Sequence, residues 1–146
     1  VIEPSVGVER LLMAIICEAY EDDKARGNIV LNFKPALSPN KVAIFPLMNK
    51  PELAEVARQL YSEFLDEDIV SYYDKSGSIG KRYARQDEIG TPYCITVDYE
   101  AIEEGKNKGT VTIRDRDTAQ QKRVDMKRLS VLINELVRGK IRFDNL

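Results

Sequence analysis

The first ten residues bring an acid, a hydroxyl group and a guanidinium group close together. They read VIEPSVGVER, in which Glu3 and Ser5 flank a proline, Gly7 follows, and Arg10 lies near the start of an apolar-periodic segment. At a helix start, free backbone N–H groups and the positive end of the dipole favour anions. Glu3 could pair with an ammonium group, and Arg10 with a phosphate or a purine. The segment predicts one wall of a nucleotide-handling site; the alternative is a capped helix with surface charges.

A second group of candidate residues lies in the run SGSIGKRYAR, residues 76–85. Two glycines and two serines there precede Lys81, Arg82 and Arg85. A glycine-rich turn that leads into a basic helix start can hold phosphate. The spacing is not that of a P-loop. The alternative is an ordinary capped helix whose basic residues pair with acids that follow in the same helix.

A third group is the run RDRD at residues 114–117, at the expected tip of a hairpin. Strand alternation places Arg114 and Arg116 on one side and the two aspartates on the other. Arginine recognises guanine edges, and aspartate accepts from cytosine amino groups. The run therefore predicts base recognition; the alternative is that these charges only stabilise the turn.

Composition limits the chemistry that these groups could perform. The chain of 146 residues is 43% hydrophobic and 32% charged, which suits one soluble core. It contains no histidine, so serine–histidine triads and most zinc sites are excluded. Its two cysteines are too far apart in sequence for a local metal knuckle. Any chemistry must therefore depend on positioning and charge.

Charge is distributed unevenly along the chain. Residues 1–105 carry 11 Lys and Arg against 19 Asp and Glu, whereas residues 106–146 carry 11 against 5. The basic end is a candidate for contact with a polyanion, and solvated surface charge is the alternative. No apolar run reaches the roughly 20 residues of a membrane span. We therefore expect a cytoplasmic protein without a membrane partner.

Apolar periodicity predicts the elements that must position these residues. A helix is expected from Val8 to Ala19, ending near the charged run 21–26, and residues 28–40 read as an extended linker. Beyond it we expect strands near 41–48, 69–74, 93–99, 110–114 and 120–126, and helices near 51–65, 81–89 and 129–137. The order βαβαβββα predicts an α/β fold, a mixed β-sheet with flanking helices, preceded by an isolated N-terminal helix.

Two parts of the sequence resemble a known family. The N-terminal run VIEPSVGVERLL is similar to the last signature motif of class II aminoacyl-tRNA synthetases. Residues 74–100 and 109–117, DKSGSIGKRYARQDEIGTPYCITVDYE and GTVTIRDRD, resemble the anticodon-binding domain of the glycyl-tRNA synthetases of the α2 type. The resemblance covers almost the whole chain.

The resemblance implies roles for individual residues. Glu3 and Ser5 match the positions that hold the substrate glycine, with Glu3 on its ammonium group. Arg10 matches the arginine that contacts ATP, and Gly7 matches the close-packing glycine of the same ATP site. The tRNA contacts expected from the matched block are Arg82, Arg85, Arg114 and Arg116.

The resemblance also implies a division of the chain. Residues 1–27 would end the catalytic domain, 28–40 would be a linker, and 41–146 would form the anticodon-binding domain. The full-length enzyme would be a homodimeric glycine-tRNA ligase that uses ATP and Mg2+ to attach glycine to its tRNA. The other two class II motifs do not occur in these residues, so we expect this chain alone to be catalytically inactive, with no cofactor bound.

The expected partner of the chain is the anticodon stem-loop of glycine tRNA, and DNA is not expected. The full-length enzyme would also bind glycine and ATP. A stand-alone RNA-binding or protein-interaction α/β module without catalysis is the alternative.

Overall fold

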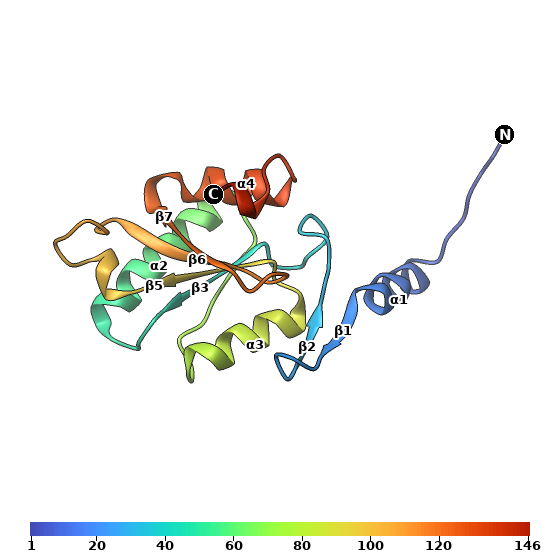
Figure 1. Cartoon of the computed structure of the whole chain (residues 1–146). Coiled ribbons are helices and arrows are strands. Elements are labelled where there is room, and N and C mark those ends of the chain that lie inside the picture. The colour runs from blue at the N-terminus through green and yellow to red at the C-terminus, as the bar shows by residue number, and fades with distance from the viewer.

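A five-stranded mixed sheet forms the centre of the molecule in the computed structural model, which describes residues 1–146 (Figure 1). Its strands, in spatial order, are β4 (Ser71–Tyr73), β3 (Val42–Pro46), β5 (Tyr93–Val97), β6 (Thr110–Asp115) and β7 (Gln121–Asp125). The first three are parallel to one another, and β6 and β7 add an antiparallel hairpin. The predicted mixed sheet is confirmed.

Helices cover both faces of this sheet (Figure 1). The main core lies on one face, beneath α2 (Pro51–Asp66) and α4 (Leu129–Val137). A smaller core of Ala43, Phe45 and Cys94 lies on the other face, beneath α3 (Ile79–Ile89). Successive strand residues point to opposite faces, so continuous apolar strands such as β3 supply both cores. The predicted order βαβαβββα after residue 40 is confirmed.

The N-terminal helix α1 (Val8–Ala19) projects away from the rest of the molecule (Figure 1). The apolar periodicity of residues 8–19 predicted this helix correctly. Of the residues in α1, only Ala19 is buried. Four large apolar side chains of α1 have more than half of their surface exposed: Val8, Leu11, Leu12 and Met13. The helix therefore has an apolar face without a partner in this chain.

The segment after α1 differs from the prediction. The helix ends at Ala19, and β1 (Tyr20–Asp23) and β2 (Asn28–Leu31) form an antiparallel hairpin where we expected a charged helix end and an extended linker. The Asp23 carboxylate accepts from the backbone N–H groups of Ala25 and Arg26, and Gly27 has a φ of 71°. These features close the turn. The strands are four residues each, too short for alternation to be recognised, and β1 is mostly charged.

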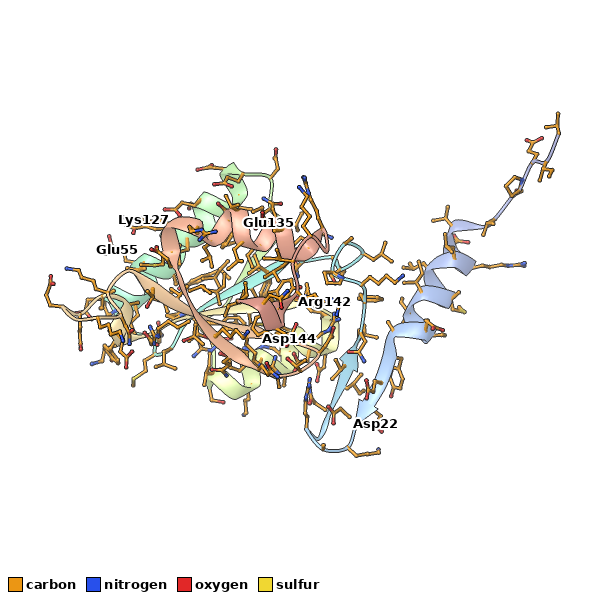
Figure 2. The ribbon with its side chains drawn as sticks, turned by 45° about the horizontal axis from the view of Figure 1, so that its top comes forward. Asp22, Glu55, Lys127, Glu135, Arg142 and Asp144 are labelled. Atoms are coloured by element: carbon orange, nitrogen blue, oxygen red, sulfur yellow. The ribbon has the colours of Figure 1, made fainter.

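Three single-turn 3₁₀ helices complete the chain, at Tyr99–Ala101, Met126–Arg128 and Phe143–Asn145. The C-terminal tail returns to the sheet, where the ring of Phe143 stacks on that of Tyr93 with 6.4 Å between centroids. Arg142 and Asp144 lie on this tail (Figure 2). None of the helices combines the length and apolar character needed to cross a membrane.

Candidate nucleic-acid interface

Arg114, a predicted RNA contact, is buried against α3. Its two terminal nitrogens donate to the Asp87 carboxylate at 2.8 and 3.0 Å, and its guanidinium lies 4.9 Å from the centre of the Tyr83 ring. Burial alone would lower the pKa of Arg114, but the hydrogen bonds and charge of Asp87 outweigh it and the pKa is raised. The guanidinium is fully engaged inside the protein, between β6 and α3.

Arg116 follows β6 and is the largest side chain among the fully buried ones, with 1% of its surface exposed. It donates to the carbonyl oxygens of Gly90 at 2.8 Å and Phe33 at 2.7 Å, and to the Asp117 carboxylate at 2.7 Å. Arg114 and Arg116 both bond to groups of α3 or its C-cap, but Arg116 lies beyond the end of β6 and also bonds to Asp117, which strand alternation had placed on the opposite side. Their partners are protein groups.

Arg82 is also buried, with its guanidinium at the carboxyl end of β3. It donates to the carbonyl oxygens of Pro46 at 2.5 Å, Leu47 at 3.3 Å and Gly77 at 3.2 Å. Burial lowers the pKa of Arg82, since removal from water disfavours the charged form. The side chain joins the β3–α2 loop to the β4–α3 turn.

Arg85 differs from the other three because 43% of its side chain is exposed. It pairs with the Asp74 carboxylate and donates to the Ser76 carbonyl at 2.8 Å. Burial opposes ionisation of Asp74, but hydrogen bonds from Ser76 and Arg85 outweigh it, so the pKa of Asp74 is lowered. Arg85 comes from the second turn of α3, and these bonds hold its guanidinium against the β4–α3 turn.

Two exposed lysines lie beside Arg85: Lys81, which belongs to the predicted phosphate-holding group but not to the predicted tRNA contacts, and Lys75, which belongs to neither. Lys75 and Lys81 flank the turn, and their ammonium groups make no hydrogen bond or ion pair within the chain. Ser78 caps the start of α3 through its hydroxyl group, as helix-start chemistry predicts. The sequence signal that could have identified Lys75 was its position at the start of the glycine-rich turn, and for Lys81 it was an exposed position in the first turn of the helix that follows.

The four predicted tRNA contacts thus divide into two groups. Arg82, Arg114 and Arg116 are internal cross-links, because each guanidinium is buried and bonded to protein acceptors. In the folded chain these three cations are taken up by protein acceptors, and their contact with RNA stays a prediction. Direct contact stays a prediction for Arg85, which lies with Lys75 and Lys81 at one end of α3.

The residues predicted to hold glycine and ATP lie at the opposite end of the molecule. Glu3, Ser5 and Gly7 occupy an extended segment before α1, and Arg10 lies in its first turn. All four are exposed, and no side chain among them bonds to another part of the chain. The structure does not bring them together with the arginines of the sheet (Figure 1). Their roles stay predictions.

Two hollows lie at the hairpin. One, of about 530 Å³, separates α1 from the segment after β2 and is lined largely by apolar residues that include Ile15, Phe33 and Leu37. The other, of about 320 Å³, is polar and includes Asp23, Arg26 and Asp117. No cluster of three or more His, Cys, Asp or Glu side chains suited to a metal ion occurs in the chain.

Comparison with known proteins agrees with this architecture. A family model described as an anticodon binding domain matches residues 41–136, which include the five-stranded sheet and most of α4. Glycine–tRNA ligase of Methanothrix thermoacetophila is 48% identical over 98% of this chain and 24% of its own length. The enzymes of Borreliella burgdorferi and Caldanaerobacter subterraneus are 51% and 46% identical over 85% and 92% of this chain.

The chain spans about a quarter of the length of these relatives. The family model matches the sheet with its covering helices. The similarity to the relatives extends to the N-terminal segment as well, since one alignment covers 98% of the chain. The chain therefore belongs to the anticodon-binding domain family, in the form found in glycine–tRNA ligases.

Proposed function

We propose that this chain binds the anticodon region of glycine tRNA as part of a glycine–tRNA ligase. The single observation that supports this most is the match of an anticodon-binding family model to residues 41–136, the residues that build the sheet. Similarity to named glycine–tRNA ligases over most of the chain supports the choice of amino acid.

The β4–α3 turn is the surface that we propose to contact RNA. Lys75, Lys81 and Arg85 provide three exposed or half-exposed cations there, beside the N-terminal end of α3. Cations and helix N-termini bind phosphate oxygens and so position a nucleic acid. Internal bonds from Arg82 and Asp74 hold the turn in place, which reduces the entropy lost on binding.

The N-terminal residues would serve the catalytic part of the same enzyme. In this proposal Glu3 and Ser5 hold glycine, and Gly7 and Arg10 contact ATP, in a Mg2+-dependent reaction of a cytoplasmic homodimer. Their exposure leaves them free for such contacts. Residues 1–27 would then belong to the catalytic domain and 41–146 to the anticodon-binding domain. The exposed apolar face of α1 supports burial of this helix against the catalytic domain.

The test is binding of the chain to an anticodon stem-loop of glycine tRNA. We expect Arg85→Ala and Lys81→Ala each to weaken binding severalfold, and log-log salt dependence with a slope of about −2 for three phosphate contacts in single-stranded RNA. Arg138→Ala is the control, because Arg138 is exposed and unpaired beyond the end of α4. Equal losses for all three variants, or equal affinity for a stem-loop with another anticodon, would contradict the proposal.

The exposed apolar face of α1 also supports a second candidate, a protein-interaction module that binds no RNA. Contacts through apolar surface depend little on salt. A binding partner held with a salt slope near zero, together with no measurable affinity for the stem-loop, would favour this candidate.

A further inference from the structure

The joint between the β1–β2 hairpin and the sheet domain is closely packed. Strand β2 lies beside α3 (Figure 1), and Val30 and Phe33 are buried. The Phe33 ring stands against Gly90, the left-handed C-cap of α3: a Cβ placed on Gly90 would lie only 2.4 Å from a ring carbon of Phe33. Residues 28–33 therefore pack on the domain as an integral part of it.

Two arginines bond across this joint in opposite directions. Arg116, from the sheet domain, donates to the Phe33 carbonyl at 2.7 Å and to the Gly90 carbonyl at 2.8 Å. Arg26, from the hairpin turn, donates to the carbonyl oxygens of Arg116 at 2.6 Å and Asp117 at 2.8 Å. Arg26 thus places both arms of its guanidinium on the backbone of the sheet domain, whereas Arg116 donates with one arm across the joint, to Phe33, and with the other to Gly90 in its own domain.

Acidic groups orient both arginines. The Asp23 carboxylate lies 3.1 Å from Nε of Arg26, and Asp117 accepts from Nε of Arg116. Asp87, which already binds Arg114 on two atoms, also lies 3.9 Å from Arg26. Hydrogen bonds from charged donors are among the stronger ones in proteins. Of the bonds across the joint, the one from Arg116 to Phe33 is buried, the one from Arg26 to Arg116 is partly buried and the one from Arg26 to Asp117 is exposed.

We propose that Arg26 and Arg116 are positioning residues that clamp the hairpin onto the C-terminal end of α3 and onto the β6–β7 turn. The clamp fixes the orientation of the segment that carries α1 relative to the sheet domain. This role rests on the proposed function, in which the N-terminal segment serves the catalytic domain and the sheet domain binds the anticodon. The joint would then set the distance between the two regions of the tRNA that the enzyme contacts. Nothing in this role requires either arginine to touch RNA.

Amide hydrogen exchange on the chain tests the clamp directly, without reference to function. We expect Arg26→Ala to raise exchange in residues 28–33 and 116–118 by about tenfold or more, since two charge-assisted bonds are lost, and to leave β3 and β5 unchanged. Lys24→Ala is the matched control: Lys24 lies in the same turn but pairs only with Asp22, on the outer strand β1 (Figure 2).

Two results would overturn the clamp. One is unchanged exchange in residues 28–33 after Arg26→Ala. The other is an equal rise in β3 and β5, which would make Arg26 a general stability residue. Both exchange results test the clamp even if the wild-type chain fails to bind the stem-loop. Failure to bind would reject the proposed function and would not bear on the clamp.

A second measurement tests the positioning role in the full-length glycine–tRNA ligase that contains this segment. Arg26→Ala is expected to lower kcat/KM for tRNA aminoacylation severalfold and to leave glycine-dependent ATP–pyrophosphate exchange unchanged, because only the reaction with tRNA depends on the joint. Unchanged aminoacylation, or an equal loss in both reactions, would overturn the role.

Discussion

At the scale of single residues, buried arginines are the main cross-links within this domain. Arg82, Arg114 and Arg116 each place a planar guanidinium against two or more fixed acceptors. Lysine, a single compact charge, cannot reproduce this geometry. Each of the three connects segments that are distant in sequence, so these side chains determine how the loops at the sheet ends are arranged.

The Arg114–Asp87 pair gives the first prediction at this scale. We expect Arg114→Ala to lower the free energy of unfolding by about 3 kcal/mol, because it leaves the buried Asp87 carboxylate without its main partner. Arg123→Ala, which breaks the more exposed pair with Asp98, should cost about 1 kcal/mol or less. Urea unfolding measures both. Wild-type stability in Arg114→Ala, with affinity for the stem-loop lost, would restore Arg114 as an RNA contact.

Tyr93 gives a prediction for alkaline pH. Burial, followed by the charges of Asp115 and Asp117, raises its pKa from 10.0 to about 12. The neutral phenol is therefore favoured by folding, and its contribution to stability is complete below pH 10 and lost as the pH rises through about 12. We expect Tyr93→Phe to flatten the fall of unfolding free energy between pH 10 and 12. The same change at the exposed Tyr20 is the control, and equal curves for Tyr93→Phe and wild type would contradict the assignment.

Of all the features of the candidate site, the roles of individual residues were the hardest to predict from the sequence. The types and spacing of Arg82, Arg85, Arg114 and Arg116 indicated contact with an anion. Sequence could not show that Asp87 and the carbonyl oxygens of Gly90 and Phe33 would take up these cations. Those acceptors come from segments that only the folded chain brings together.

At the scale of elements, long apolar-periodic segments were predicted well and short polar ones were not. Every α-helix and strand after residue 40 was expected in its observed order, because buried strands and amphipathic helices carry strong periodic patterns. The β1–β2 hairpin was missed, since Tyr20–Asp23 is mostly charged. Its stability comes from tertiary contacts at Val30 and Phe33, which local sequence does not reveal.

Gly90 and Gly109 allow a matched test of how the hairpin packs on α3. Both have positive φ, 80° and 78°, so alanine is strained at either position. A Cβ at Gly109 would meet no atom within 4 Å, whereas one at Gly90 would collide with Phe33. We expect Gly109→Ala to cost about 1 kcal/mol and Gly90→Ala about 2 kcal/mol more, by urea unfolding. Equal costs would mean that Phe33 does not press on Gly90 in solution.

At the scale of the whole molecule, the chain consists of a well-packed sheet domain and a helix that this domain does not cover. The hairpin joins the two and is bonded to the sheet domain through Arg26, Phe33 and Arg116. A helix of 12 residues is marginal in water without packing. The stability of the chain is therefore expected to reside almost entirely in residues 20–146.

Matched leucine truncations test this division. Leu12 on α1 is 56% exposed, whereas Leu53 on α2 is 0% exposed in the main core. We expect Leu53→Ala to lower the free energy of unfolding by about 2–5 kcal/mol, through lost burial and the cavity left behind. Leu12→Ala should change it by less than about 0.5 kcal/mol, because its side chain already meets water. A loss at Leu12 comparable to that at Leu53, independent of protein concentration, would mean that α1 packs on the sheet domain. A loss that grows with concentration would instead show that α1 pairs with a second copy.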